Sequence, residues 1–378
     1  MSVKTFSYSP RRGWSQRLPV ELDSPQTLVL AFCAPSFYDE RRPVDEILAA
    51  FPQSHLLGCS TAGEIYGAEL RDESLSCAVV RFEDTLLRRA YARVEGAASS
   101  FAAGAAVAEQ LAAPDLRGIF VLSDGHTVNG TALIRGLGSV LPEGLAITGG
   151  LAADGSRFQR TWVIRDRDLC QGEVSAVGFY GERIRIGHGS QGGWDIFGPE
   201  RLITRSEGNV LFELDGRPAL ELYKEYLGEL SAGLPATALL FPLAVRAPGD
   251  GRQTVRTVLD VSEKDSSMTF AGDVPAGSMA QLMKANFDRL VQGASQAALA
   301  TRANTPEDVD VLAVAISCVG RRLVLGERTE EELEVTVETL PRRTHLIGFY
   351  SYGEISPYGE GRCELHNQTM TLTTFAEP

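Results

Sequence analysis

The sequence predicts a mixed α/β fold in which strand–helix–strand–loop–strand units repeat and form mixed sheets. Its 378 residues are 44% hydrophobic and 22% charged, the composition of a folded protein long enough for two domains. Short apolar runs alternate with stretches of helical period. The chain also repeats itself, because GCSTAGEI at 58–65 returns as GFYSYGEI at 348–355. This repetition indicates a duplicated core.

The order of elements occurs three times along the chain. The first unit is predicted to contain a strand at 27–33, a helix at 44–51, the loop from Gly58 and a strand at 75–82. The second contains 118–123, 131–141, a weaker loop copy (GGLAADG) at 149–155, and 174–180. The third contains 311–318, 329–340, the loop from Gly348, and 369–375. A match of the whole order is stronger support for repetition than a match of one motif.

Caps and apolar stripes locate the helices. Asn129 is a candidate N-cap, and TEEE at 329–332 indicates a capping box, in which Thr and the third Glu satisfy amides reciprocally. Further helices are expected after Pro218 and over 279–298, where apolar residues recur at helical spacing. The Ala-rich stretch 97–113 is expected to play the same part before the second unit. A domain boundary is expected near 205–217.

The charge balance argues against several partners. With 36 Lys+Arg and 49 Asp+Glu the net charge is −13, which disfavours nucleic acid and anionic membranes. No apolar run approaches the roughly 18–20 residues of a membrane span, and the N-terminus lacks the apolar core of a signal peptide. The six cysteines form no CxxC pair. We therefore expect a cytoplasmic protein with reduced cysteines and without membrane insertion.

The two GxxxxGE loops form the first candidate ligand site. Glycine lets backbone N–H groups approach a ligand because it has no Cβ, and pseudo-symmetry would turn the loops toward a common cleft. The alternative, given equal weight, is a tight turn whose glutamate caps backbone amides. Neither loop has the plan of a P-loop or of GxGxxG, so ATP and NAD are unsupported. The candidate residues are Cys59, Ser60, Thr61, Gly63, Glu64, Tyr352, Gly353 and Glu354.

Three further residues are candidate ligands. His188 lies in the glycine-rich segment RIGHGSQGGW, where a planar cofactor could approach its ring; the alternative is an exposed loop histidine. His366 opens HNQT before the last strand and could be structural or a ligand. Arg217 lies beside a helix start, where its guanidinium and the first amides could hold a carboxylate. A surface ion pair with Asp215 or Glu221 explains Arg217 at least as well.

Catalytic motifs are sparse. The sequence has no GxSxG, no HExxH and no clustered Asp/His metal set. Ser123, Asp124 and His126 lie in one loop of four residues, which does not easily form a linear triad. Cys59 as a nucleophile, or a loop glutamate as a base, is an enzyme alternative without specific support.

Seven segments, in this order, together resemble the FIST family, named for F-box and intracellular signal transduction proteins. They are 58–64, 149–155, 174–179, 209–220, 317–321, 348–354 and 366–369. The resemblance implies a FIST N domain at 26–215 and a FIST C domain at 216–375. It also implies a sensory, ligand-binding role in intracellular signalling, with output through a separate partner.

Similarity to stand-alone bacterial FIST proteins implies something more specific. Such a protein would bind haem, sense nitric oxide at the iron and regulate a partner histidine kinase. Haem needs an axial ligand, for which His188 and then His366 are the candidates. Two alternatives stay open: a sensor of an amino acid or another small carboxylate held by Arg217 and the loop amides, and an enzyme using Cys59 or a loop glutamate.

Overall fold

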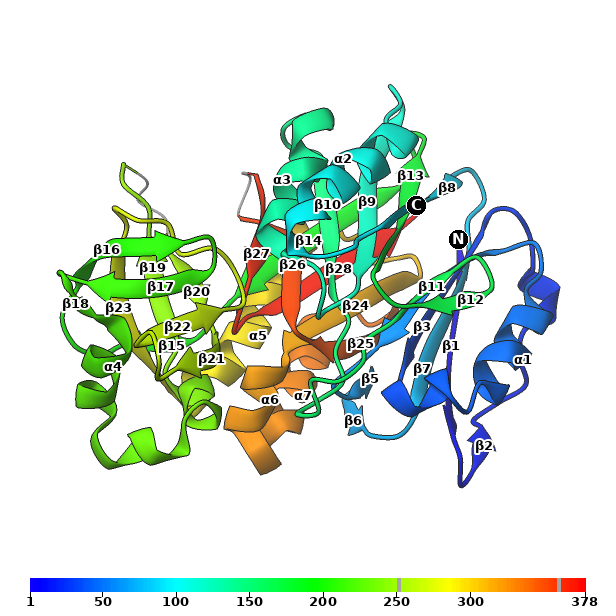
Figure 1. Ribbon diagram of the computed structural model, residues 1–378. Coiled ribbons are helices and arrows are strands. Elements are labelled where there is room, and N and C mark those ends of the chain that lie inside the picture. The colour runs from blue at the N-terminus through cyan, green and yellow to red at the C-terminus, as the bar shows by residue number, and fades with distance from the viewer. Residues whose placement is uncertain (250–252, 359–361) are drawn as a thin grey trace.

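The computed structural model describes residues 1–249, 253–358 and 362–378 and contains three similar units and one large insertion (Figure 1). The first unit comprises β3 (Thr27–Cys33), α1 (Arg42–Ala50), β4 (His55–Ser60) and β7 (Leu75–Arg81). The second comprises β9 (Leu116–Ser123), α3 (Gly130–Val140), β10 (Ala146–Leu151) and β13 (Glu173–Tyr180). The third comprises β24 (Val311–Cys318), α7 (Thr329–Thr339), β25 (Thr344–Ser351) and β28 (Met370–Ala376). The predicted α/β class with repeated units is confirmed.

Each unit builds its sheet with the same strand order. The first two strands run parallel, and the third lies antiparallel to the first, as in β3, β4 and β7. A strand that precedes the unit then pairs with the third strand. These preceding strands are β1 (Ser2–Ser9), β8 (Leu86–Arg93) and β14 (Arg185–Gln191). The three sheets are therefore copies of one topology.

The units exchange hairpins in a cycle. The hairpin of β5 (Glu64–Tyr66) and β6 (Glu69–Arg71) leaves the first unit and pairs with β25 of the third. The hairpin of β11 (Val163–Arg165) and β12 (Asp168–Cys170) pairs with β4 of the first unit. The hairpin of β26 (Gly353–Pro357) and β27 (Cys363–His366) pairs with β10 of the second unit. This exchange relates the units by a pseudo-threefold arrangement.

A central apolar core joins the inner faces of the three sheets. Phe32 packs on Phe349 with ring centroids 4.7 Å apart, and Phe375 packs on Phe179 and Phe120 at 4.7 and 6.0 Å. Helices cover the outer faces: α1 in the first unit, α2 (Ser100–Leu111) with α3 in the second, and α5 (Phe287–Thr301) with α7 in the third. The centre of the three units is therefore filled by side chains.

The glycine that opens each repeated motif lies inside a strand. Gly58, Gly149 and Gly348 face Ala31, Val121 and Ala315 on the adjacent parallel strand. A Cβ at these glycines would lie 2.3, 1.8 and 1.8 Å from the carbonyl oxygen of the facing residue. Close strand packing therefore accounts for the repeated glycine.

The insertion lies between β14 and α5, on the left of Figure 1, and is mostly antiparallel sheet. Its elements are β15 (Trp194–Ile196), β16 (Arg201–Glu207), β17 (Val210–Leu214), β18 (Arg217–Pro218), α4 (Ala219–Leu227), β19 (Leu243–Arg246), β20 (Thr254–Arg256), β21 (Val258–Ser262), β22 (Ser267–Phe270) and β23 (Met279–Ala285). It has its own core, which includes Tyr223, Met268 and Phe270. The helix expected after Pro218 is α4, so this prediction is confirmed.

The helix predicted over 279–298 is wrong in its first part. Residues 279–285 form β23, which pairs with β19 and β16. The helix α5 begins only after Asn286, whose side chain accepts a hydrogen bond from the Arg289 amide at 3.2 Å. Pairing with distant strands therefore overrides the local helical spacing.

The predicted capping box at 329–332 is also wrong, whereas the Asn129 cap is confirmed. Asn129 accepts a hydrogen bond from the Ala132 amide at 2.9 Å. Thr329 is already helical, and its hydroxyl donates to the Gly326 carbonyl at 2.6 Å. Glu332 is fully buried and forms an ion pair with Arg321 at 2.7 Å. Glu332 therefore pairs with the buried Arg321 side chain and does not cap the start of the helix.

The strand β2 (Gly13–Trp14) and the α-helix α6 (Val319–Leu325) complete the strands and α-helices of the described residues. Within the described residues, no helix is both long enough and apolar enough to cross a membrane.

Candidate functional site

The loops at the carboxyl ends of β4, β10 and β25 meet one another. The Ala62 amide donates to the Tyr350 carbonyl at 2.8 Å, and the Tyr350 amide donates to the Gly63 carbonyl at 2.9 Å. The Ala153 amide donates to the Ser60 carbonyl at 3.0 Å, which joins the second loop to the first. Ligand sites in open α/β sheets often lie at the carboxyl ends of strands. The three loops therefore define the first place to examine.

Two of these loops are braced by a buried glutamate. Glu64 accepts hydrogen bonds from the Thr61 hydroxyl at 2.5 Å and from the Ser74 hydroxyl and amide at 2.6 and 3.1 Å. Glu354 does the same with the Ser351 hydroxyl at 2.7 Å and the Thr369 hydroxyl and amide at 2.9 and 3.3 Å. Burial raises the pKa of each glutamate to about 8, against the effect of these hydrogen bonds. Both carboxyl groups hold the loop in place.

The second loop is braced differently. Asp124, at the end of β9, accepts hydrogen bonds from the Thr161 hydroxyl at 3.0 Å and the Gly172 amide at 3.2 Å. Its other oxygen accepts from the amides of His126 and Thr127 at 2.9 and 2.8 Å. Because Asp124 holds this loop, the loop's own acid, Asp154, is available for other contacts.

Asp154 connects a histidine and a tyrosine from different units. Its Oδ1 accepts a hydrogen bond from the Tyr352 hydroxyl and lies 3.4 Å from Nε2 of His126. Its Oδ2 accepts from the amides of Gln159 and Arg160 at 2.8 and 2.9 Å. In the described part of the chain, Nδ1 of His126 has no hydrogen-bond partner. This leaves one imidazole nitrogen for an external group.

Electrostatics support a charged pair in this cluster. The Asp154 carboxylate raises the pKa of His126, against the opposite effect of burial. Burial alone would raise the pKa of Asp154, but hydrogen bonds from His126, Tyr352 and two amides outweigh it and lower that pKa. Burial and the adjacent Asp154 raise the pKa of Tyr352. Asp154 is thus held ionised, and it favours the protonated form of His126.

A cavity of about 180 Å³ opens beside this cluster. Phe158 stacks on Tyr352 with centroids 5.0 Å apart and planes 3° apart, and its backbone φ is 48°, which is uncommon for a bulky residue. The insertion supplies part of the wall through Asn209, Leu259 and Phe270. Most of the lining is apolar, and its ionisable side chains are His126 and Tyr352. The cavity therefore suits a small molecule with an apolar body and one polar end.

The other predicted loop residues have structural contacts. Cys59 is fully buried in the central core, and burial raises the pKa of its thiol, which disfavours the thiolate needed for nucleophilic attack. Ser60 accepts a hydrogen bond from the Trp162 amide at 3.1 Å. A Cβ on Gly63 would lie 2.4 Å from the Arg322 guanidinium, and one on Gly353 would lie 3.0 Å from Leu365. Of the predicted loop residues, only Tyr352 lines the His126 cavity.

Arg217 and His188 lie apart from this cluster. Arg217 is exposed on β18 of the insertion and pairs with Glu225, rather than with Asp215 or Glu221. His188 is a strand residue of β14, opposite Thr373, and burial lowers its pKa. It lines neither the His126 cavity nor the cavity at His366. The structure thus separates these two residues from the loops with which they were grouped.

His366 lines a larger cavity of about 430 Å³ together with Trp194, Tyr358 and Asn367. Its Nε2 lies 3.0 Å from the Ser356 carbonyl, which can only accept, and its Nδ1 lies 3.3 Å from the Ser190 hydroxyl. Both ring nitrogens are therefore engaged, and burial lowers the pKa of His366 to about 4. This arrangement does not fit axial ligation of haem iron.

The His126 cavity does not fit haem either. His126 has a free nitrogen, but a cavity of about 180 Å³ is smaller than the several hundred Å³ typical of large-ligand sites. Within the described residues, no group of three or more His, Cys, Asp or Glu side chains could hold a metal ion.

Sequence reasoning missed His126, Asp154 and Phe158 as a site. Polar residues that directly follow two strands could have indicated the site. They are residues 124–126 after β9 and Asp154 after β10. The contact to Tyr352 crosses 198 residues and depends on the hairpin exchange. A search for a triad within the single loop 123–126 could not find it.

Comparisons with known proteins identify relatives over most of the chain. A family model described as FIST N domain matches residues 27–217, and one described as FIST C domain matches 219–357. An uncharacterized protein of Mycobacterium bovis is 30% identical over 271 residues, which cover 68% of this chain and 67% of that protein. An uncharacterized protein of Methanocaldococcus jannaschii is 25% identical over 268 residues, covering 62% of this chain and 49% of that protein.

Among solved structures, a cyanuric acid hydrolase from A. caulinodans aligns over 99% of this chain and 98% of that chain, with 10% identity and a TM-score of 0.33. A TM-score this low supports no statement about the present chain. The two family matches together span most of the 378 residues. The chain therefore belongs to the FIST family, with a FIST N domain followed by a FIST C domain.

Proposed function

We propose that this FIST protein is a sensor that binds a small molecule in the cavity beside His126. The observation that carries the proposal is the His126–Asp154–Tyr352 cluster, which joins the ends of strands from two units and leaves one imidazole nitrogen free at a cavity. A buried carboxylate that orients a histidine is common at sites where the other ring nitrogen works.

The cavity favours a ligand with an apolar body and a hydrogen-bond acceptor or negative charge. Protonated His126 would donate from Nδ1, while Phe158, Phe270 and Leu259 would contact apolar atoms. Amino acids and small carboxylic acids have this chemistry and this size. This is the small-ligand alternative from the sequence, with His126 in the place that Arg217 was expected to take.

Signal output would use the insertion. The cavity wall is shared between the units and the insertion, so an occupant contacts both. A ligand that binds more tightly when the insertion is packed against the units would shift the population toward that packed conformation. The insertion would then present a different surface to a signalling partner.

Haem binding, nitric oxide sensing and regulation of a histidine kinase stay predictions that rest on family resemblance. Neither His366 nor His126 combines a free nitrogen with a large cavity. The test is an absorption spectrum of the protein after addition of haem. A Soret band that shifts with nitric oxide and disappears in His188→Ala or His366→Ala would favour haem over the small-ligand proposal.

The small-ligand proposal is tested by thermal unfolding and by NMR of ¹⁵N-histidine-labelled protein. The probes are the common amino acids, acetate, propionate and benzoate. We expect at least one probe to raise the melting temperature saturably and to shift the His126 ring signals.

His126→Ala should abolish that response, and Phe158→Ala should weaken it about tenfold through lost apolar contact. Arg217→Ala is the matched control and should respond as the wild type. Equal responses of the wild type and His126→Ala would overturn the assignment of the site.

A further inference from the structure

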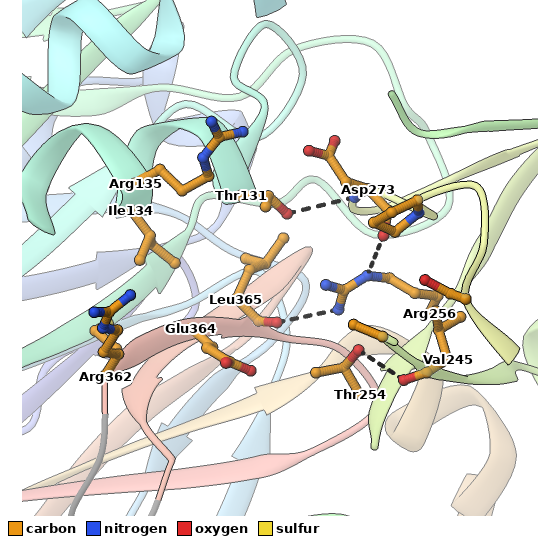
Figure 2. Close-up of a pocket in the computed structure, with 14 residues that line it drawn as sticks. Thr131, Ile134, Arg135, Val245, Thr254, Arg256, Asp273, Arg362, Glu364 and Leu365 are labelled. Atoms are coloured by element: carbon orange, nitrogen blue, oxygen red, sulfur yellow. Dashed lines mark hydrogen bonds between the residues drawn. The ribbon is translucent and has the colours of Figure 1, made fainter. Parts of the chain in front are cut away.

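A third cavity, of about 370 Å³, lies between the second unit and the insertion (Figure 2). Its lining includes Thr131 and Arg135 of α3, Arg256 of β20, and Arg362 and Leu365 near β27. It shares no lining residue with the His126 cavity. Nothing in the proposed sensing role uses it.

Arg256 is the unusual residue of this cavity. Arg256 is only 7% exposed to solvent. Even so, no carboxylate among the described residues lies within 4.0 Å of its guanidinium. Its partners are carbonyl oxygens: Nε donates to Asp273 at 3.0 Å, and Nη1 donates to Val255 at 3.1 Å and Leu365 at 3.2 Å. The second amino group, Nη2, has no partner in the described part of the chain.

Buried arginines are normally neutralised by an acid, as Arg321 is by Glu332. The two acids that line the Arg256 cavity, Asp273 and Glu364, attract the Arg256 guanidinium electrostatically, but neither forms a direct ion pair with it. Figure 2 shows the Asp273 carboxylate turned away from the Arg256 guanidinium, and Asp273 accepts instead from Asn129 at 3.1 Å. A buried guanidinium that lacks a direct ion pair and faces a cavity is what an anion site requires.

Two more cations stand at the same cavity. Arg135 is exposed and makes no ion pair within the described residues, and Arg362 pairs with exposed Glu143. The lining holds three arginines and two acids, a formal charge of 3 − 2 = +1, and Glu143 outside the lining offsets Arg362. The lining is thus richer in cations than the acidic chain as a whole.

We propose that the cavity lined by Arg135, Arg256 and Arg362 binds a small oxyanion, a phosphate or carboxylate group, and that the bound anion ties the insertion to the second unit. Nη2 of Arg256 donates to the anion, and the positive charges of Arg135 and Arg362 at the rim attract it without direct contact. The lining residues come from both the second unit and the insertion. A bound anion therefore stabilises the contact between these two parts of the molecule.

The test uses the full chain, with inorganic phosphate and citrate as separate probes at constant ionic strength set by chloride. Titration calorimetry and thermal unfolding report binding. We expect saturable binding of one probe and a rise in melting temperature of a few degrees. Binding of phosphate but not citrate assigns a phosphate group, and the reverse assigns a carboxylate. Absence of saturable binding by both probes overturns the proposal.

Variants locate the site. Arg256→Gln should abolish binding, since it removes the charged donor, and Arg135→Ala should weaken binding about threefold, since it removes an attracting charge at the rim. Glu143→Gln is the control and should bind as tightly as the wild type or more tightly. Arg135 is exposed, so Arg135→Ala tests the site even if Arg256→Gln fails to fold. Unchanged affinity in both Arg135→Ala and Arg362→Ala would refute the site.

His126→Ala should keep full anion binding, which separates this proposal from the sensing proposal.

Discussion

The loops of the first and third units differ from the loop of the second in what their acid does. Glu64 and Glu354 are buried, protonated more readily than usual and bonded to matching serine and threonine residues. Asp154 is held ionised and contacts His126 and Tyr352 beside a cavity. Two of the three units have a buried glutamate that holds the loop in place, whereas the second unit has Asp154, which faces a cavity. A departure from internal symmetry therefore points to the site better than the repeated motif does.

The largest expected effect is on stability. Glu354→Ala should lower the free energy of unfolding by about 2–4 kcal/mol, because it leaves a cavity and the buried donors of Ser351 and Thr369 without a partner. Glu64→Ala should behave alike. Denaturant unfolding measures both. His126→Ala, which alters a partly exposed side chain, should cost less than about 1 kcal/mol. Equal losses in all three variants would erase the distinction between the loops.

The pH dependence of stability comes next. Between about pH 4.3, the ordinary glutamate value, and about 8 the folded protein holds protons on Glu64 and Glu354 that the unfolded chain has released. Stability should therefore fall as pH rises through this window, by at most about 1.4 kcal/mol per pH unit for each glutamate. Glu354→Gln should remove about half of that slope. An unchanged slope would show that Glu354 is ionised in the folded state.

The second-unit loop should show its own titration. The pKa of His126 should lie above that of an ordinary histidine and should drop in Asp154→Asn, since the adjacent negative charge is lost. The stability contributed by this pair should be lost as pH rises through the raised pKa of His126. NMR titration of the imidazole measures both values. Tyr352→Phe, which leaves the carboxylate charged, should shift this pKa less than Asp154→Asn does.

The smallest effect is expected at Arg217. Its ion pair with Glu225 is exposed on both sides, so Arg217→Ala should change the free energy of unfolding by less than about 0.5 kcal/mol. Ligand responses should be unaffected. A loss of ligand binding in Arg217→Ala would move the site from the second-unit loop to the insertion.

Most regular elements of the units could be predicted from local patterns. The strands at 27–33 and 311–318 have the predicted bounds, because continuous apolar runs are needed for strands buried on both faces. Residues 279–285 and Glu332 could not be assigned in this way. Distant partners, β19 for the former and Arg321 for the latter, decided their roles.

The candidate site was less predictable than the fold. Tyr352 was predicted as a ligand-binding residue, but its partner Asp154 lies in another unit and reaches it only because β26 pairs with β10. Arg256 carried no motif at all, and its importance comes from burial without a direct ion pair among the described residues.

The sequence by itself determined the α/β class, the triple repeat and the family, because apolar periodicity and recurring motifs are local properties of the chain. Only the tertiary structure decided which acids brace loops and which face a cavity. Those roles depend on burial and on partners tens to hundreds of residues away, and hairpins exchanged among three units bring those partners together.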